Sequence, residues 1–223
     1  MRADAARSRR KILDAARDVF LERGADAPLD LIVRRAGIGP ATLYRRYPDR
    51  QALVRDLAED LLTRLGEVAR AALAEAERSG DAFAALRSFL HEAARMRMGA
   101  VVIVLLEQLT PSASLVRVRA ETAAAAEELV RAARGQGALR DGIGLGDLVL
   151  LSVRLVRPLT GPLARLDPDG VLLHRDLDLA LDGLDARAAH HAPTTADHPA
   201  EGLSFADLLA AAEEPDSAAA PKR

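Results

Sequence analysis

Residues 37–46 carry the side chains whose types and spacing most clearly suggest chemistry. The stretch reads Gly37, Ile38, Gly39, Pro40, Ala41, Thr42, Leu43, Tyr44, Arg45 and Arg46. A glycine turn can cradle a phosphate with its backbone N–H groups. Arginine side chains can instead form paired hydrogen bonds to the edge of a guanine base. The first interpretation predicts nucleotide chemistry, and the second predicts DNA recognition.

The nucleotide interpretation fails on its context. A phosphate-binding loop needs a strand before its glycines and a Lys-Ser/Thr pair after them, and neither stands near Gly37. A second glycine run, the "GIGLGD" of residues 142–147, also lacks a preceding strand. We therefore expect the stretch "RDGIGLGD" to be a loop between helices, and the first glycine pair to separate two short helices.

The elements around the glycine turn follow from the apolar spacing. Leu29, Ile32, Val33 and Ala36 form one stripe, which predicts a two-turn helix ended by Gly37. Pro40 suits the first turn of the next helix, because its missing N–H has no partner there. Leu43 and Tyr47 then share a face, and Pro48 ends the helix. A preceding helix is expected from a Ser8 cap to Arg23.

Two short helices joined by a turn of this length match a helix-turn-helix, over about residues 28–47. In that motif the second helix enters the major groove with its N-terminal residues forward. The predicted DNA-binding residues are Pro40, Ala41, Thr42, Tyr44, Arg45, Arg46 and Arg50. Arg45 or Arg46 would contact guanine, a pairing worth about 1–3 kcal/mol of discrimination. Arg50 would hold a backbone phosphate.

The rest of the chain also shows helical periodicity. Further helices are expected over about residues 50–78, 81–98, 99–110, 112 or 114 to 135, 148–156 and 171–189, with Asp49 and Asp81 as caps. The predicted fold is all-α, with about nine helices. We divide it into a DNA-binding domain (1–50), a helical bundle (51–189) and a tail (190–223). The tail is rich in Pro, Ala, Thr and acidic residues, which predicts disorder.

The charge distribution, a basic N-terminal segment on an acidic body, fits either a polyanion-binding module or a solvated basic arm. The 223 residues include no cysteine, which excludes disulfides, thiol nucleophiles and cysteine-based metal sites. Residues 1–55 hold 13 Lys and Arg against 7 Asp and Glu, although the whole chain has a net charge of -2. No signal peptide follows the basic start, and the longest apolar run, 100–106, is too short to span a bilayer. We expect a cytoplasmic protein that makes no contact with membranes.

The N-terminal residues resemble a known family. The stretches "KILDAARDVFLERG" and "IVRRAGIGPATLYRRYPDRQAL" are similar to the N-terminal domain of TetR/AcrR bacterial transcriptional regulators. The resemblance covers about residues 8–65. It implies a homodimer that places two recognition helices on a pseudo-palindromic, double-stranded DNA operator. It also implies a C-terminal pocket for a small-molecule effector, and it implies repression as the usual action.

For the pocket and the dimer that the resemblance implies, we expect two sets of residues. The expected pocket lining is Phe89, His91, Met96, Met98, Leu105, Gln108 and Arg119. The expected dimer interface on the last two long helices is Leu148, Leu151, Leu155, Leu173, Leu177, Leu181 and Leu184. Each set has an alternative, because Met, Phe and Leu at helical spacing also build the core of a single chain.

Four positions depart from the family pattern. Gly39 stands where Ser is usual, which removes a side-chain cap from the recognition helix. Pro28 replaces a Thr, which removes a cap and a phosphate contact. Arg50 replaces a Lys and keeps the charge, and Tyr47 replaces a Phe and keeps the packing.

Two other classes of function were weighed. One is a helical protein that binds a small molecule or a partner and does not regulate through DNA. The presence of Tyr44, Arg46 and Arg50 argues against it. The other is an enzyme, but no nucleophile-base pair, metal set or paired carboxylates have a supporting context. We expect no enzymatic activity, no cofactor and no metal.

Overall fold

The computed structural model describes residues 2–24, 26–97, 112–156, 171–188 and 206. Within these residues the chain forms eight α-helices and no strand, which confirms the all-α prediction. They are α1 (Arg2–Arg23), α2 (Leu29–Ala36), α3 (Pro40–Arg46), α4 (Arg50–Ser79), α5 (Ala82–Arg95), α7 (Ala113–Gly135), α8 (Leu145–Leu155) and α9 (Val171–Leu184). The helix expected over 99–110 and the tail, apart from Ala206, lie outside the described residues.

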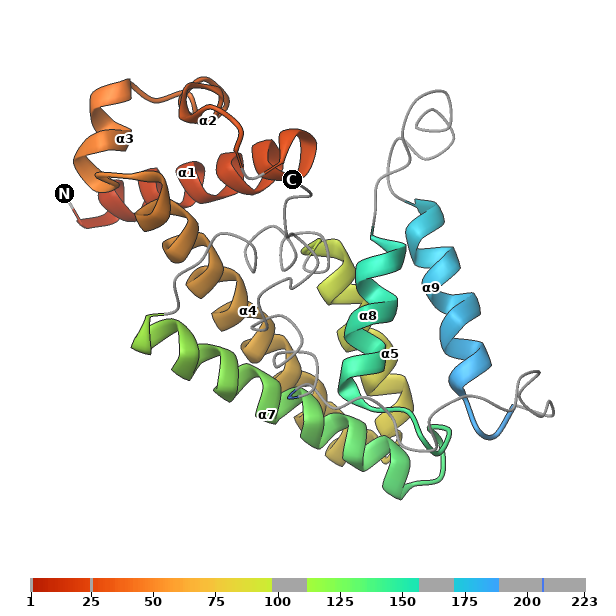
Figure 1. The fold of residues 1–223 in the computed structure, drawn as a ribbon. Coiled ribbons are helices and arrows are strands. Elements are labelled where there is room, and N and C mark those ends of the chain that lie inside the picture. Colours follow the sequence, from red (N-terminus) through yellow and green to blue (C-terminus); the bar gives the residue numbers. More distant parts are fainter. Residues whose placement is uncertain (1, 25, 98–111, 157–170, 189–205, 207–223) are drawn as a thin grey trace, which may run out of the picture.

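The helices form two groups joined by α4 (Figure 1). Helices α1, α2 and α3 gather at one end, and α4 runs from α3 into a bundle with α5 and α7. Helices α8 and α9 lie side by side on the far side of the bundle, and α9 also packs against α5. The molecule therefore presents a small N-terminal unit on one end of a long helix.

The buried apolar residues form two clusters that divide along α4. The first combines α1, α2 and α3 with α4 as far as Leu61, and its fully buried side chains include Ile12 and Leu43. The second begins on α4 at Ala69 and takes in α5, α7, α8 and α9. Leu65 packs against both clusters. Helix α4 is continuous through both clusters and therefore connects the N-terminal unit to the bundle.

Helix α7 begins against the N-terminal cluster. Leu115, in its first turn, is buried among the residues of that cluster. The hydroxyl of Ser114 donates to the carboxylate of Glu59 on α4 at 2.5 Å. The start of α7 thus contacts the same part of α4 that packs against the N-terminal helices.

The predicted caps are confirmed where local rules decide the helix end. The carboxylate of Asp49 accepts from Ala52 N at 2.7 Å, and that of Asp81 accepts from Ala84 N at 2.9 Å. The hydroxyl of Ser112 accepts from Leu115 N at 3.2 Å. These side chains satisfy backbone N–H groups that have no partner within the helix.

Four predicted helix ends were wrong. Helix α1 begins at Arg2 rather than at Ser8, because residues 2–7 favour a helix and Asp4 pairs with Arg7 at 2.5 Å. Helix α5 ends at Arg95, before the expected residue 98. Helix α8 begins at Leu145 rather than at 148, because the Asp147 carboxylate accepts from Gly144 N at 2.8 Å. The second half of "GIGLGD" is therefore helical.

The fourth wrong end is that of α9, which was expected to reach residue 189. The helix stops at Leu184, and Asp185 forms an isolated antiparallel bridge with Leu139. Arg140 N donates to Leu184 O at 3.1 Å, and Ala186 N donates to Ala138 O at 2.9 Å. Backbone pairing with the segment after α7 thus replaces the last expected turn of the helix.

Helices α4 and α7 lie close together at Gly66. A Cβ built on Gly66 would lie 2.9 Å from Thr122 Oγ1, and Thr122 is buried on α7. The Thr122 hydroxyl donates to Leu62 O on α4 at 2.8 Å. Glycine at this position lets the two helices cross at short distance.

Gly66→Ala should therefore lower the free energy of unfolding by about 1–2 kcal/mol, because the new methyl group overlaps Thr122. In a Thr122→Ala background the Thr122 hydroxyl, which would overlap the new methyl group, is absent. There the same change should stabilise the protein by about 0.5–1 kcal/mol, because alanine favours a helix over glycine. Denaturant unfolding of the four proteins in the cycle measures both effects. The same sign in both backgrounds would contradict a close approach at Gly66.

Candidate nucleic-acid interface

The glycine turn ends one helix and precedes the next, as the sequence predicts. Gly37 has φ 63° and ψ 40°, the left-handed conformation in which glycine avoids a steric penalty. Ile38 N donates to Val33 O at 3.3 Å, which closes α2. Gly39 is extended and provides no side-chain cap, and Pro40 begins α3. This geometry holds α2 and α3 in a helix-turn-helix.

Helix α3 buries one side chain and presents the rest to solvent. Leu43 is its fully buried residue. Tyr44 is 49% exposed, an unusual exposure for a large side chain. Pro40, Ala41, Arg45 and Arg46 are exposed, and Thr42 is half-buried. The structure thus places six of the seven predicted DNA-binding residues together on one short helix.

The first turns of α1 lie beside this helix. Arg46 donates from its guanidinium to Ala5 O at 3.0 Å. A groove between the two helices is lined by Asp4, Ala5, Ser8, Thr42, Arg45 and Arg46. The sequence analysis missed these residues of α1 because it placed the start of the helix at Ser8. The helix-forming composition of residues 2–7 was the available signal.

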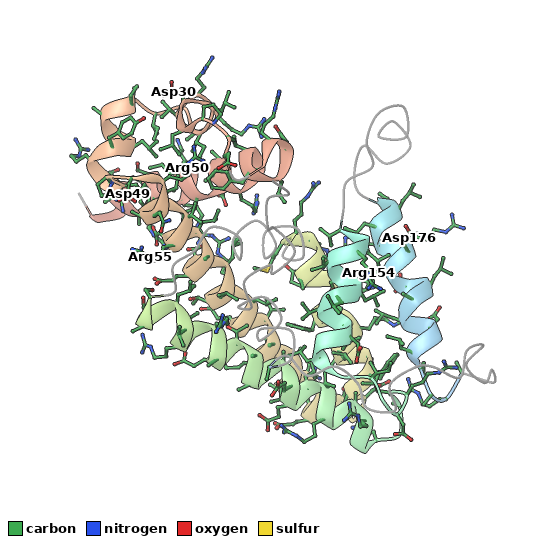
Figure 2. The ribbon with its side chains drawn as sticks, viewed as in Figure 1. Asp30, Asp49, Arg50, Arg55, Arg154 and Asp176 are labelled. Atoms are coloured by element: carbon green, nitrogen blue, oxygen red, sulfur yellow. The ribbon has the colours of Figure 1, made fainter. Side chains whose placement is uncertain are left out.

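Arg50, the seventh predicted residue, contacts the loop between α1 and α2. Its guanidinium donates to Ala27 O at 2.7 Å and lies 6.0 Å from the ring centroid of Phe20. Figure 2 labels Arg50 and the capping residue Asp49 at the start of α4. Arg50 therefore connects α4 to the loop, and its contact with a phosphate stays a prediction.

A carboxylate on α4 connects three helices of the N-terminal unit. Arg9 on α1 donates to Asp56 through Nε at 3.0 Å and through a terminal nitrogen at 2.7 Å. Its other terminal nitrogen donates to Asp60 at 2.9 Å. The phenol of Tyr47, which follows α3, donates to Asp56 at 2.6 Å. The sequence analysis assigned Tyr47 to packing alone and did not single out Arg9 or Asp56.

The contacts at Asp56 shift the pKa values of Asp56 and Tyr47. Burial opposes ionisation of Asp56, but hydrogen bonds from Arg9 and Tyr47 outweigh it and hold the pKa of Asp56 below its usual range. Burial, together with the hydrogen bond to Asp56, raises the pKa of the Tyr47 phenol above its usual range. Asp56 therefore accepts as a carboxylate, and Tyr47 donates as a neutral phenol.

Acid should weaken this part of the fold. In an unfolded chain an aspartate titrates at about pH 3.9. Because the folded pKa of Asp56 is lower, its ionised form stabilises the protein fully above about pH 5. That stabilisation is lost as the pH falls through the lower folded value. Denaturant unfolding between about pH 5 and 2 should show a smaller acid dependence in Asp56→Asn than in the wild type. Equal dependence in the two proteins would rule out this role.

Four of the predicted pocket residues, Phe89, His91, Met96 and Arg119, lie within the described part of the chain. Phe89 is buried in the second cluster, whereas Met96 packs at the edge of the first. Arg119 is half-buried on α7. Met98, Leu105 and Gln108 lie outside the described residues. The described residues therefore support the core alternative for Phe89, and a ligand contact by the others stays a prediction.

His91 contacts α9 through both of its ring nitrogens. Its Nδ1 lies 2.8 Å from Nδ1 of His174, and its Nε2 lies 2.8 Å from a carboxylate oxygen of Asp178. Arg87, one turn earlier, donates to the same carboxylate at 2.7 Å and also pairs with Asp182. These contacts join α5 to α9. A ligand contact by His91 would require their displacement.

Three of the predicted interface leucines belong to the core of their own chain. Leu148, Leu177 and Leu181 are each at most 2% exposed within the second cluster. The other four are half-buried, and Leu155, Leu173 and Leu184 pack against that cluster. The exposed apolar side chains of α9 are Val171 and Leu179, at 65% and 62%. The burial of these three leucines agrees with the core alternative, and the contact of the seven leucines with a second chain stays a prediction.

The described residues contain neither an arrangement suited to a metal ion nor a helix suited to a membrane. Over these ranges no group of three or more His, Cys, Asp or Glu side chains is arranged to hold a metal ion. No helix among them has the length and apolar character required to cross a membrane.

Comparisons with known proteins identify the helix-turn-helix unit. Residues 12–57 match the family model described as bacterial regulatory proteins, tetR family. These residues include α2, α3 and the first turns of α4. A comparison with curated proteins found no match.

Solved structures resemble the chain over most of its length. The TetR transcription regulatory protein from Mycobacterium vanbaalenii is 31% identical, with a TM-score of 0.54 over 82% of this chain and 98% of that one. A TetR transcriptional regulator from Streptomyces coelicolor is 29% identical, with a TM-score of 0.55 over 84% and 99%. The TetR-like regulator LfrR from Mycobacterium smegmatis, in complex with proflavine, is 26% identical, with a TM-score of 0.53 over 85% and 99%.

These matches cover both the helix-turn-helix and the helices that follow it. Members of the family are regulators of transcription rather than enzymes, which agrees with the exposed basic face of α3. The chain belongs to the TetR family of bacterial regulatory proteins and is a DNA-binding transcriptional regulator.

Proposed function

We propose that the protein is a homodimeric repressor that binds a pseudo-palindromic operator and releases it when a small molecule binds. The observation that carries this proposal is the face of α3, where Thr42, Tyr44, Arg45 and Arg46 stand around a single buried anchor, Leu43. Side chains held in this way can reach base edges and phosphates in the major groove.

The proposed dimer pairs α8 and α9 with the same helices of a second chain. Val171 and Leu179 expose large apolar side chains on α9, and Leu151 on α8 is half-buried. Leu148, Leu177 and Leu181 support this surface from inside, because they pack it onto the rest of the bundle. A self-complementary contact between the two copies would bury these exposed groups.

The proposed response to an effector uses α4. This helix contributes to both apolar clusters, so a ligand that displaces it in the bundle also displaces α1, α2 and α3. The relative LfrR has been solved in complex with proflavine, which supports a small-molecule effector for this chain. We place the effector site in the bundle of residues 51–189 and the DNA-binding residues in the preceding unit.

Selection of binding sites from random DNA tests this function. We expect the wild-type protein to enrich one sequence with two-fold symmetry and half-sites about one helical turn apart, because two α3 helices read successive major grooves. Sedimentation of the complex should show one dimer on each short duplex. Enrichment of an asymmetric site bound by a single chain would contradict the dimeric mode. Absence of any enriched sequence would contradict operator binding itself.

A further inference from the structure

The side chain of Tyr47 has a polar contact that a phenylalanine could not make. We propose that Tyr47, Asp56 and Arg9 position the recognition helix α3 against α1 and α4, and so increase discrimination between DNA sequences. This inference rests on the proposed operator binding. Tyr47, Asp56 and Arg9 act here as positioning residues, since the bases are read by side chains of α3 itself.

The geometry gathers three helices at one carboxylate. Tyr47 follows the last residue of α3 and is 4% exposed, and its phenol donates to Asp56 Oδ2 at 2.6 Å. Arg9 donates to both oxygens of the same carboxylate, at 2.7 and 3.0 Å. A paired contact between Arg and a carboxylate fixes direction as well as distance. The position of the Tyr47 hydroxyl is therefore defined relative to both α1 and α4.

The protonation states strengthen this arrangement. Hydrogen bonds from Arg9 and Tyr47 overcome the burial of Asp56, so its pKa is low and it accepts as an anion. The raised pKa of Tyr47, which results from burial and from Asp56, keeps the phenol protonated as a donor. A hydrogen bond to a charged acceptor is shorter and stronger than one between neutral groups.

Helix α3 depends on the contact between Tyr47 and Asp56 because the helix itself has few stabilising features. It has seven residues, it lacks a side-chain cap at Gly39, and it buries one side chain, Leu43. A helix this short gains its stability from tertiary packing. One buried anchor leaves α3 free to tilt about Leu43, and a second attachment at Tyr47 restricts that tilt. Arg45 and Arg46, next to Tyr47, are then held in a narrower range of positions.

The test compares Tyr47→Phe with the wild type on two duplexes, the selected site and a scrambled one. The ring still fills its place in the core, and only the hydroxyl is lost. We expect affinity for the selected site to fall about tenfold, near the lower end of the loss caused by removal of one charge-assisted hydrogen bond. Affinity for the scrambled duplex should be unchanged, because it depends on phosphate contacts. An unchanged ratio between the two duplexes would overturn the positioning role.

Glu22→Gln serves as the matched control. Glu22 on α1 makes a paired contact with Arg35 on α2, at 2.6 and 2.9 Å, in the same N-terminal unit. Its loss removes an exposed contact between α1 and α2 without touching the attachment of α3. We expect the ratio between the two duplexes to stay at the wild-type value in Glu22→Gln. An equal fall in both variants would overturn the proposal, because any weakening of the unit would then suffice.

A measurement without DNA tests the contact itself. The chain has two tyrosines and no tryptophan, so Tyr47 is the one tyrosine left in a Tyr44→Phe background. Its phenol should remain unionised past the ordinary value of about pH 10. Addition of Asp56→Asn should move its ionisation to lower pH, as followed by ultraviolet absorbance. Ionisation at about pH 10 with helicity intact in both proteins would overturn the contact.

The DNA titrations and the ionisation of Tyr47 together distinguish failure of operator binding from failure of the positioning role. A wild-type protein that selects no duplex would overturn operator binding, and the positioning role with it, even with the tyrosine contact intact. A wild type that selects a site, with Tyr47→Phe retaining the same ratio, would overturn the positioning role alone.

Discussion

Leu43→Ala is expected to lower the free energy of unfolding by about 3 kcal/mol and to abolish specific DNA binding. Leu43 is fully buried and is the one buried side chain of α3. Its truncation removes three carbon atoms from the first cluster and leaves a cavity that the short helix cannot close without moving. Because α3 then loses its anchor, the loss of binding should exceed what the fall in stability alone predicts.

Denaturant unfolding and DNA titration measure the two effects in the same preparation. Val116→Ala is the control, because this α7 side chain is 43% exposed and lies outside both apolar clusters. We expect it to change stability by less than about 0.5 kcal/mol and to leave binding intact. A Leu43→Ala protein that still distinguishes the selected duplex from a scrambled one would contradict the role of Leu43 as the anchor.

Arg46→Ala and Arg50→Ala are expected to weaken DNA binding in different ways. Arg46 is exposed on α3, and its contact in the free protein is with Ala5 O. Its loss should reduce discrimination between the selected and scrambled duplexes about tenfold, the value of one good base contact. Arg50→Ala should weaken binding to both duplexes alike and reduce the salt dependence of binding by about one counterion.

Arg50→Ala should have a second effect that is weaker in Arg46→Ala, because the contact of Arg50 with Ala27 O is part-buried and that of Arg46 with Ala5 O is exposed. The guanidinium of Arg50 also donates to Ala27 O in the loop before α2. Its removal leaves that carbonyl without this partner and should lower stability by about 1 kcal/mol. Titrations of both variants on both duplexes, with unfolding curves beside them, measure these differences. Identical losses on the two duplexes for both variants would contradict the division of roles.

The sequence predicted the local features of the fold well. The end of α2 follows from Gly37, and the start of α3 follows from Pro40. The starts of α4 and α5 follow from Asp49 and Asp81. Each of these signals acts within a few residues of its own position, so no knowledge of the packing is needed. The same reasoning placed the exposed residues of α3, because a single apolar position, Leu43, fixes which face points inward.

Contacts between distant segments were not predictable in the same way. The attachment of Arg9 to Asp56 spans 47 positions, and nothing in the local spacing pairs an arginine of α1 with that aspartate. The leucine stripe of α9 likewise shows that one face is apolar, but not which surface covers it. The structure covers Leu177 and Leu181 with the protein's own bundle and leaves Val171 and Leu179 exposed on α9, which the stripe alone could not predict.

The most direct test of the central claim is a gel-shift titration of the full-length wild-type protein on the DNA upstream of its own gene. The controls are an unrelated duplex of equal length and an excess of nonspecific competitor, and the titration is done at moderate salt. We predict a discrete complex on the upstream DNA that resists the competitor and that needs about tenfold more protein in Arg46→Ala. Equal binding to both duplexes by a folded protein, or no complex on either, would contradict sequence-specific regulation through α3.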